Sequence, residues 1–487
     1  MNNRKKIEFG DFQTPIDLAE SICHQLIQLG ISPNTIIEPT CGVGAFILSA
    51  ATLFPSVQEI HGFDINPFYL EQLKTKLTAI KYQANINLTQ ADFFKTNWQS
   101  LIDSLNGSIL ILGNFPWVTN TTQSIIGSDN LPKKSNFLNH NGFDAISGKA
   151  NFDISEWMLL ELLRCFSERS GNIAMLIKTS VARKILAHAK QQKLPICNAK
   201  LFTIDTKKTF NACVDACLLV IELVEQPEQA NYDYAIYDSL FSQSAIEIKH
   251  KNGLVINNLS AFESSAFLIG QCPQKWRSGI KHDAASIMEL TRTTNGLMQN
   301  GLCEVIDIET DFLYPLLKGS DIANNKSWQE KFVLVPQRFV GEPTDTIQLT
   351  HPKSWQYLEN HAVILDKRAS IIYKKNPRFS IFGIGDYAFR PWKIAICSLY
   401  KSLRFRLIAP IENKPVMFDD TVYYLSFDNE KEARETFALL TSKPSINLLS
   451  SLIFWDDKRP IKTSILNKLD WSKLNYTQNK TLYYEIP

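Results

Sequence analysis

Residues 113–117 read Gly-Asn-Phe-Pro-Trp and follow a short apolar run, so they place polar and aromatic groups at the end of an expected strand. The exocyclic amino group of adenine is a poor nucleophile because its lone pair is conjugated into the ring. Two acceptors around that nitrogen would draw its hydrogens out of plane and localise the lone pair. The Asn114 side-chain oxygen and the Phe115 carbonyl could be these acceptors, and Trp117 could stack on an extruded base. A turn at Asn114 and Pro116 beside a core tryptophan is the alternative.

A glycine turn lies further towards the N-terminus, where residues 38–46 read Glu-Pro-Thr-Cys-Gly-Val-Gly-Ala-Phe. It joins an expected strand at 35–37 to an expected helix at 45–54. Gly42 and Gly44 would let the backbone turn tightly and approach a ligand, and the free N–H groups of the helix would face that ligand. A simple connector between strand and helix is the alternative.

Two acidic residues follow the next two expected strands. Asp64 lies about 20 residues beyond the glycines, at the position that suits hydrogen bonds to two ribose hydroxyls. It could instead cap the helix that begins at Pro67. Asp92 could accept the amino group of an adenine while Phe93 packs on the ring, or Asp92 could simply belong to a turn. Three such strand ends in sequence order favour a nucleoside-containing ligand.

Strand-like and helix-like segments alternate through the first half of the chain. This rhythm predicts βαβ units and an α/β fold with a doubly wound, mostly parallel sheet, in which ligands bind at the carboxyl ends of the strands. Near residue 224 the sequence becomes polar and resembles a linker. Beyond about residue 265 the strand–helix alternation ends, and aromatic and basic residues become frequent. We therefore expect two domains, a ligand-binding domain at 1–265 and an α+β domain at 266–487.

Composition limits the classes of protein to which the chain can belong. It has 487 residues, 45% hydrophobic and 21% charged, with 51 basic and 49 acidic residues and hence a net charge of +2. These values are typical of a folded protein and exclude binding to nucleic acid by bulk charge. No apolar stretch is long enough for a membrane helix, and no signal peptide follows the basic start. The nine cysteines form no CxxC pair, which predicts a reducing cytoplasm and no structural metal site.

The motifs together resemble those of S-adenosylmethionine-dependent DNA amino-methyltransferases, especially the gamma-class adenine-N6 enzymes of bacterial restriction–modification systems. That family reads Asn/Asp-Pro-Pro-Tyr/Phe/Trp where this chain reads Asn-Phe-Pro-Trp, so Phe115 replaces the first proline. Residues 9–15, Phe-Gly-Asp-Phe-Gln-Thr-Pro, resemble the N-terminal motif whose position before the glycine turn marks the gamma arrangement. The resemblance is strong over roughly residues 8–224 and implies a class I, Rossmann-like methyltransferase fold.

The resemblance also implies roles for individual residues. Thr14 would hold the methionine carboxylate, Glu38 the methionine ammonium group and Asp64 the ribose, while Phe210 would be the second aromatic around a flipped base. The residues implied in S-adenosylmethionine binding are Thr14, Glu38, Pro39, Cys41, Gly42, Gly44, Asp64, Ile65, Asp92, Phe93, Asn114 and Phe152. Those implied in catalysis and base stacking are Asn114, Phe115, Pro116, Trp117 and Phe210.

Residues 367–406 form a basic segment, with ten Lys or Arg residues, one acid and eight aromatics. Such a segment can neutralise phosphates while a few side chains read base edges, although a solvated basic face is the ordinary explanation. The residues that we predict to contact DNA are Lys133, Lys134, Arg390, Lys393, Lys401 and Arg404. The two lysines at 133 and 134 could equally belong to a surface loop.

We therefore expect a cytoplasmic, monomeric DNA adenine-N6 methyltransferase that acts on double-stranded DNA. A separately encoded restriction endonuclease is the expected partner, in a restriction–modification or phage-defence system. A methyltransferase for RNA or protein and a non-catalytic DNA-binding subunit are the alternatives. Asp238 with residues 247–249, Glu-Ile-Lys, superficially resembles a nuclease core, but no nuclease-sized segment remains outside the methyltransferase motifs.

Overall fold

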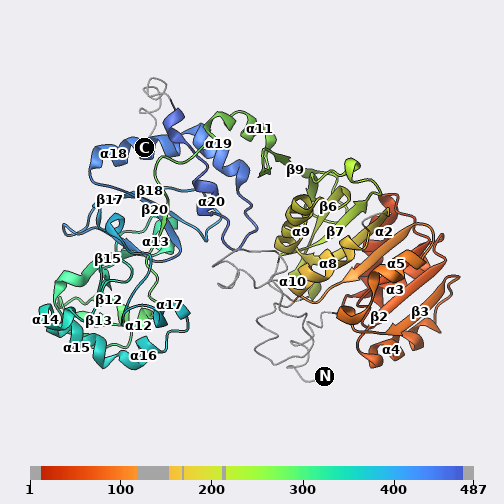
Figure 1. The fold of residues 1–487 in the computed structure, drawn as a ribbon, viewed down its shortest axis with the longest axis horizontal. Coiled ribbons are helices and arrows are strands. Elements are labelled where there is room, and N and C mark those ends of the chain that lie inside the picture. The colour runs from red at the N-terminus through yellow and green to blue at the C-terminus, as the bar shows by residue number, and fades with distance from the viewer. Residues whose placement is uncertain (1–12, 118–152, 167–168, 211–214, 475–487) are drawn as a thin grey trace. The chain divides into compact units, whose positions relative to one another are not determined.

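The computed structural model describes residues 13–117, 153–166, 169–210 and 215–474. The chain divides into two compact units, Met1–Asn257 and Asn258–Pro487 (Figure 1). The division falls eight residues before the boundary expected from the sequence. The short helix α11 (Leu259–Glu263) therefore belongs to the second unit.

The first unit is built on a ten-stranded sheet with the order β10-β9-β8-β6-β7-β5-β4-β1-β2-β3 (Figure 1). Its strands are β1 (Thr35–Glu38), β2 (Glu59–Asp64), β3 (Asn85–Gln90), β4 (Ile109–Asn114), β5 (Gly171–Lys178), β6 (Ile196–Ile204), β7 (Ala216–Leu223), β8 (Tyr234–Tyr237), β9 (Ala245–Lys251) and β10 (Leu254–Ile256). Strands β1 to β5 pair in parallel, whereas β7 runs antiparallel to both β5 and β6. The expected doubly wound, mostly parallel sheet is thus confirmed.

The helices of this unit precede β1 or lie between successive strands, and they pack apolar residues against the sheet. They are α2 (Ile16–Gln28), α3 (Ala45–Leu53), α4 (Pro67–Leu77), α5 (Trp98–Ser104), α8 (Ile154–Arg164), α9 (Thr179–Gln192) and α10 (Thr206–Phe210). In α2, buried residues recur at helical spacing, as Ala19, Ile22, Cys23 and Leu26 show. The same core cluster contains residues of α3, α4 and the strands β1 and β4, so the sheet and these helices form one hydrophobic core.

The second unit contains two smaller sheets of short, mostly antiparallel strands. One has the order β11-β20-β17-β18 and the other β14-β13-β12-β16-β15-β19. The strands are β11 (Arg277–Ser278), β12 (Glu289–Arg292), β13 (Met298–Asn300), β14 (Val305–Ile306), β15 (Leu313–Leu317), β16 (Lys331–Leu334), β17 (Trp392–Cys397), β18 (Arg406–Ile408), β19 (Met417–Phe418) and β20 (Val422–Phe427). The helices are α12 (Ala285–Met288), α13 (Gly319–Ala323), α14 (Ile347–Thr350), α15 (Pro352–Asn360), α16 (Ala362–Asp366), α17 (Ile371–Lys374), α18 (Glu430–Thr441), α19 (Lys443–Leu452) and α20 (Thr463–Leu466). An α+β second domain is therefore present, as expected.

Within the residues that the structure describes, no helix combines the length and apolar character needed to cross a membrane. The same residues contain no group of three or more His, Cys, Asp or Glu side chains placed to hold a metal ion.

Candidate active site at the sheet edge

The carboxyl ends of the parallel strands bring the predicted site residues to one edge of the first sheet. Glu38, Asp64 and Asn114 are the last residues of β1, β2 and β4. Strands β2 and β3 follow on one side of β1, and strands β4 and β5 follow on its other side. The strand order therefore reverses between β1 and β4. Ligands of open α/β sheets bind in the crevice at such a point.

The glycine turn has the backbone conformation that its sequence predicts. Gly42 and Gly44 have φ angles of 51° and 82°, in the left-handed region that favours glycine. Gly44 precedes α3 without a side-chain cap, so the first N–H groups of this nine-residue helix lack the usual capping side chain. The turn is also held from outside, because Val43 N–H donates to Gln13 Oε1 at 3.1 Å.

Asp64 joins the glycine turn to the start of α4. Its Oδ2 accepts from Gly42 N–H at 2.7 Å, and its Oδ1 accepts from Asn66 N–H at 2.8 Å. Asn66, rather than Asp64, caps α4 by accepting from Phe68 N–H at 3.1 Å. The helix-cap alternative for Asp64 was therefore wrong. Ile65 beside it is 39% exposed, so this part of the edge is accessible to a ligand.

Glu38 is a buried carboxyl group at the centre of the same edge, with only 2% of its surface exposed. Burial, followed by repulsion from Asp64, raises the pKa of Glu38 well above its usual range. Its Oε2 has no hydrogen-bond partner among the described residues. Gly113 leaves room for the side chain, since a Cβ at that position would lie 3.3 Å from Glu38 Cγ. A buried acceptor of this kind is suited to a cationic group of a ligand.

Asp92 and Phe93 have local structural roles. Asp92 caps the short 3₁₀ helix Phe93–Lys95 by accepting from Phe94 N–H at 3.0 Å. The Phe93 ring is 7% exposed and packs edge-on against Phe115, with ring centroids 5.8 Å apart and an interplanar angle of 84°. Most of the Phe93 ring is thus covered by protein. The predicted packing of Phe93 on an adenine ring would therefore use the small part of its ring that remains exposed.

Asn114 is held by two threonines from different segments. Its Nδ2 donates to Thr14 Oγ1 at 3.3 Å, and its main-chain carbonyl accepts from Thr40 Oγ1 at 3.1 Å. The side chain of Phe115, which is 1% exposed, points into the aromatic cluster around Phe93. The structure therefore brings Thr14 of the N-terminal motif, the glycine turn and Asn114 together.

Trp117 and Phe210 also meet, although they are 93 residues apart in the sequence. Phe210 ends α10 just before the reversed strand β7, and this reversal brings the segment to the same edge as the end of β4. The ring centroids lie 5.1 Å apart with an interplanar angle of 69°. A base stacked between two parallel rings needs about 7 Å, so the expected sandwich is not formed in this arrangement.

Several predicted residues fall outside the described part of the chain, namely Phe152, Lys133 and Lys134. Next to them the structure shows an ion pair that the sequence did not reveal. Lys178, the last residue of β5, lies with its Nζ 2.5 Å from Oδ2 of Asp153, and both side chains are mostly buried. Asp153 also caps α8 by accepting from Ser155 N–H at 3.2 Å. Asp153 lies in the stretch Asn-Phe-Asp at 151–153, which resembles the family segment that closes over the cofactor, but its pairing with Lys178 could not be predicted.

Lys393 was predicted to contact DNA, and this prediction was wrong. The residue lies on the central strand β17 of the smaller sheet and has 0% of its surface exposed. Its Nζ donates to the carbonyl of Ala388 at 2.7 Å and to the carbonyl of Val416. Burial lowers the pKa of Lys393 to about 7. The ammonium group is therefore a core hydrogen-bond donor and cannot reach a phosphate.

The rest of the basic segment is less available than its composition suggests. Arg368 is buried and donates to three main-chain carbonyls, while Arg378 pairs with Asp366 and Glu359. Arg390 lies 3.6 Å from Asp428, with 43% of its side chain exposed. Exposed basic residues of the segment that remain candidates for DNA contact include Lys367, Lys374, Lys375, Arg390, Lys401 and Arg404.

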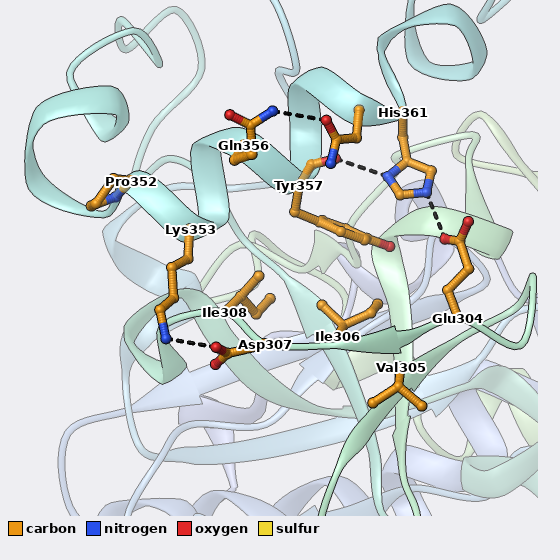
Figure 2. Close-up of a pocket in the computed structure, with 11 residues that line it drawn as sticks. Glu304, Val305, Ile306, Asp307, Ile308, Pro352, Lys353, Gln356, Tyr357 and His361 are labelled. Atoms are coloured by element: carbon orange, nitrogen blue, oxygen red, sulfur yellow. Dashed lines mark hydrogen bonds and ion pairs between the residues drawn. The ribbon is translucent and has the colours of Figure 1, made fainter.

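A groove of about 670 Å³ opens in the second unit between residues 304–308, which include β14, and α15 (Figure 2). Figure 2 shows two contacts across it, the ion pair of Lys353 with Asp307 and the hydrogen bond between His361 and Glu304, each at 2.7 Å. None of the residues predicted from the motifs lines this groove. The predicted chemistry therefore belongs to the sheet edge of the first unit.

The strand order with β7 reversed between β5 and β6 fits the class I methyltransferase fold that the sequence predicts. The chain is 49% identical over 471 residues to the Type II methyltransferase M.NspV of Nostoc sp. (strain ATCC 29411 / PCC 7524), and the match covers 96% of this chain and 97% of that relative. The chain therefore belongs to the Type II methyltransferases of restriction–modification systems. Its cofactor is S-adenosylmethionine.

A solved structure extends the similarity of fold over both units. The Type IIL restriction-modification enzyme MmeI, determined in complex with DNA, matches with a TM-score of 0.56 and 13% identity. The match covers 97% of this chain and 66% of the MmeI chain, so this chain spans about two thirds of that enzyme's length. No protein-family model matches the sequence.

Proposed function

We propose that this chain is a gamma-class DNA methyltransferase that transfers a methyl group from S-adenosylmethionine to N6 of an adenine flipped out of double-stranded DNA. The observation that carries the proposal is the convergence of Asn114 with Glu38, Asp64 and the glycine turn at one sheet edge. This convergence supports a polar loop of the required composition acting beside groups that suit a nucleoside with a cationic part.

The residues at this sheet edge fit the cofactor. Glu38 would accept the ammonium group, because its buried Oε2 has no hydrogen-bond partner among the described residues. Asp64 would accept ribose hydroxyls with the remaining lone pairs of a carboxylate that Gly42 and Asn66 already hold in place. Gly42 and Gly44 would let the backbone come close to the ligand. When bound there, the cofactor supplies an electrophilic methyl group.

The acceptor side of the reaction would be formed by residues 114–117. The Asn114 side-chain oxygen and the Phe115 carbonyl would accept the two hydrogens of the adenine amino group and raise its nucleophilicity. Such catalysis depends on alignment and needs no covalent enzyme intermediate. Trp117 and Phe210 would have to move apart before a base could lie between them, since their rings now contact each other.

The second unit would bind DNA and select the site. Lys401, Arg404 and Arg390 are exposed and can neutralise phosphates, as can Lys133 and Lys134 in the part of the chain outside the described residues. The relative M.NspV is named a Type II methyltransferase, and MmeI was determined with DNA, which supports this role. We further propose that the enzyme acts as a monomer in the cytoplasm beside a separately encoded endonuclease.

Transfer of a radiolabelled methyl group to duplex DNA, RNA and protein tests the proposal. We expect label in duplex DNA, and nucleoside analysis should identify N6-methyladenine. Asn114→Ala should abolish transfer while cofactor binding survives, whereas Asn198→Ala, at an exposed position on β6, should behave as wild type. Label in RNA, in protein or in cytosine, or full activity of Asn114→Ala, would overturn the proposed reaction.

A further inference from the structure

We propose that Thr40 is a positioning residue for methyl transfer, because its hydroxyl fixes the peptide group that joins Asn114 to Phe115. The inference rests on the proposed function of Asn114 and deepens it. Thr40 Oγ1 donates to the Asn114 carbonyl at 3.1 Å, across 74 residues of sequence, and the bond is partly buried. Thr40 itself touches only the main chain of the reacting loop in this contact.

Thr40 is mounted on a rigid turn. The neighbouring Cys41 N–H donates to the Phe63 carbonyl of β2 at 2.7 Å, and Gly44 N–H donates to the Cys41 carbonyl at 2.8 Å. The same turn is held to the end of β2 by the bond between Gly42 and Asp64. A hydroxyl presented from this turn has little freedom to follow a moving partner, so it can act as a fixed point for the Asn114 carbonyl.

The loop needs such a fixed point because sheet pairing ends before it. The register between β1 and β4 stops at Ile37 and Ile111, and β4 remains paired with β5 only as far as Asn114. On the β1 side the register ends before Asn114, and there the Thr40 hydroxyl donates to the Asn114 carbonyl. Residue 115 is a phenylalanine, so no proline ring fixes its φ angle.

Two further contacts hold the side chains of Phe115 and Asn114, whereas Thr40 holds the main chain between them. The Phe115 ring packs against Phe93 and holds the residue from the other side. Thr14 accepts from the amide group of the Asn114 side chain, so it orients that side chain and leaves the main chain to Thr40. Loss of the Thr40 hydroxyl should therefore let the Asn114–Phe115 peptide rotate and misplace the Phe115 carbonyl, without removing a ligand contact.

The decisive comparison is Thr40→Val, which keeps the shape and removes the hydroxyl, with Thr40→Ser, which keeps the hydroxyl. We expect Thr40→Val to lower kcat on the order of 10- to 100-fold, because a small misplacement of a reacting group costs that much. The KM for DNA and the Kd for the cofactor should stay within about twofold, and Thr40→Ser should recover most of kcat. Thr52→Val, which removes an exposed hydroxyl from α3, is the matched control and should match wild type.

Wild-type kcat in Thr40→Val would overturn the inference. So would a fall in cofactor affinity or melting temperature that accounts for the lost activity, because that would show a merely structural role. If Thr40→Val does not fold, Thr40→Ala removes the same hydroxyl with less bulk and permits the same comparison. The proposed function fails separately, when the wild-type enzyme itself transfers no methyl group to adenine in DNA.

Discussion

Residue type identified two regions as functional, the sheet edge of the first unit and the basic segment 367–406 of the second unit. In the structure, the residues of the first region come together, whereas several of the second are buried or paired. At the sheet edge, Glu38, Asp64 and Asn114 converge, and specific hydrogen bonds hold Asp64 and Asn114. In the basic segment, Lys393 is buried and Arg378 is tied up in ion pairs. Position relative to a strand was therefore a better guide than charge.

The physical reason lies in the geometry of parallel sheets. Strand ends of such a sheet meet at one edge, so a residue that follows a strand has a known place in three dimensions. A run of basic residues carries no comparable constraint, because alternate residues of a strand point to opposite faces. Residues 392–397 read Trp-Lys-Ile-Ala-Ile-Cys, and this apolar run indicates a buried strand. Lys393 is buried because it lies within this strand.

The largest effect is expected on the stability of the second unit when Lys393 is replaced, and this tests most directly whether Lys393 is a core residue or a DNA contact. Lys393→Ala should destabilise the second unit by about 3 kcal/mol or more, because it creates a cavity and leaves two buried carbonyls without a donor. Lys393→Met, which fills the cavity, should cost less. Thermal unfolding and limited proteolysis measure both. A stable Lys393→Ala protein that has lost DNA affinity would return this residue to the DNA interface.

The pH dependence at Lys393 gives a second measurement of the same contrast. The folded pKa of about 7 lies below the ordinary value of 10.5, so between these values the unfolded chain binds more protons than the folded one. The free energy of unfolding of the wild type should then rise from pH 7 to pH 9 relative to that of Lys393→Met. A constant difference between the two proteins over this range would show that Lys393 does not titrate as its burial implies.

Glu38 should show the next largest effect, on the other side of the comparison. Glu38→Gln should weaken cofactor binding on the order of 10- to 100-fold, because it removes the charge-assisted bond that we propose to the ammonium group. Because burial raises the pKa of Glu38 and the proposed bond needs the ionised carboxylate, wild-type affinity should increase with pH. Titration calorimetry at several pH values measures both effects. Glu20→Gln, at an exposed site on α2, is the control. If the pH dependence of cofactor affinity persists in Glu38→Gln, the Glu38 carboxyl group is not its source.

A smaller effect is expected for Gly44→Ala. Its comparison with Gly30→Ala distinguishes the effect of backbone strain from the effect of steric contact at the site. An alanine here would adopt a left-handed φ of 82° and place its Cβ 2.2 Å from Leu73, so cofactor affinity should fall about tenfold. Gly30→Ala is a close control, because Gly30 has a φ of 81° and nothing within 4 Å of the added Cβ. Melting temperatures and cofactor affinities of both variants are to be compared. Equal cofactor affinities in the two variants would mean that the turn does not shape the pocket.

The smallest effects are expected for the exposed basic residues. Lys401→Ala and Arg404→Ala should each weaken DNA binding about threefold, and each should reduce the salt slope by about 0.9 if it contacts one phosphate. Arg378→Ala should change DNA affinity less, because Asp366 and Glu359 already neutralise that side chain. Binding isotherms at several salt concentrations provide the measurement. If all three variants bind as wild type, the basic segment is not part of the interface.

Much of the first unit could be predicted because local patterns and the sheet topology agree. The helix expected at 45–54 is found as Ala45–Leu53, and the glycines before it adopt the predicted turn. The order of β6, β7 and β8 could not be predicted, because a reversed strand inserts between two others and no local pattern encodes that choice. In the second unit the strands are short, and periodicity over two to six residues is too weak to fix their pairing.

Within the site, the sequence predicted which residues gather but not which way their groups point. The bond from Thr40 to Asn114 and the ion pair of Lys178 with Asp153 join residues 74 and 25 positions apart. The direction of the Phe115 ring and the edge-on contact of Trp117 with Phe210 follow from packing, which depends on all neighbours at once. Residue spacing carries no information of that kind.

The reversal of β7 has an evolutionary consequence. The glycine turn and Asp64 follow β1 and β2, whereas the segments after β4 and before β7 arrive from the other half of the sheet. Under the proposed function, insertions or exchanges in those two segments would alter what accepts the methyl group while the cofactor half keeps its framework. A scaffold divided in this way can diversify its acceptors by loop replacement alone.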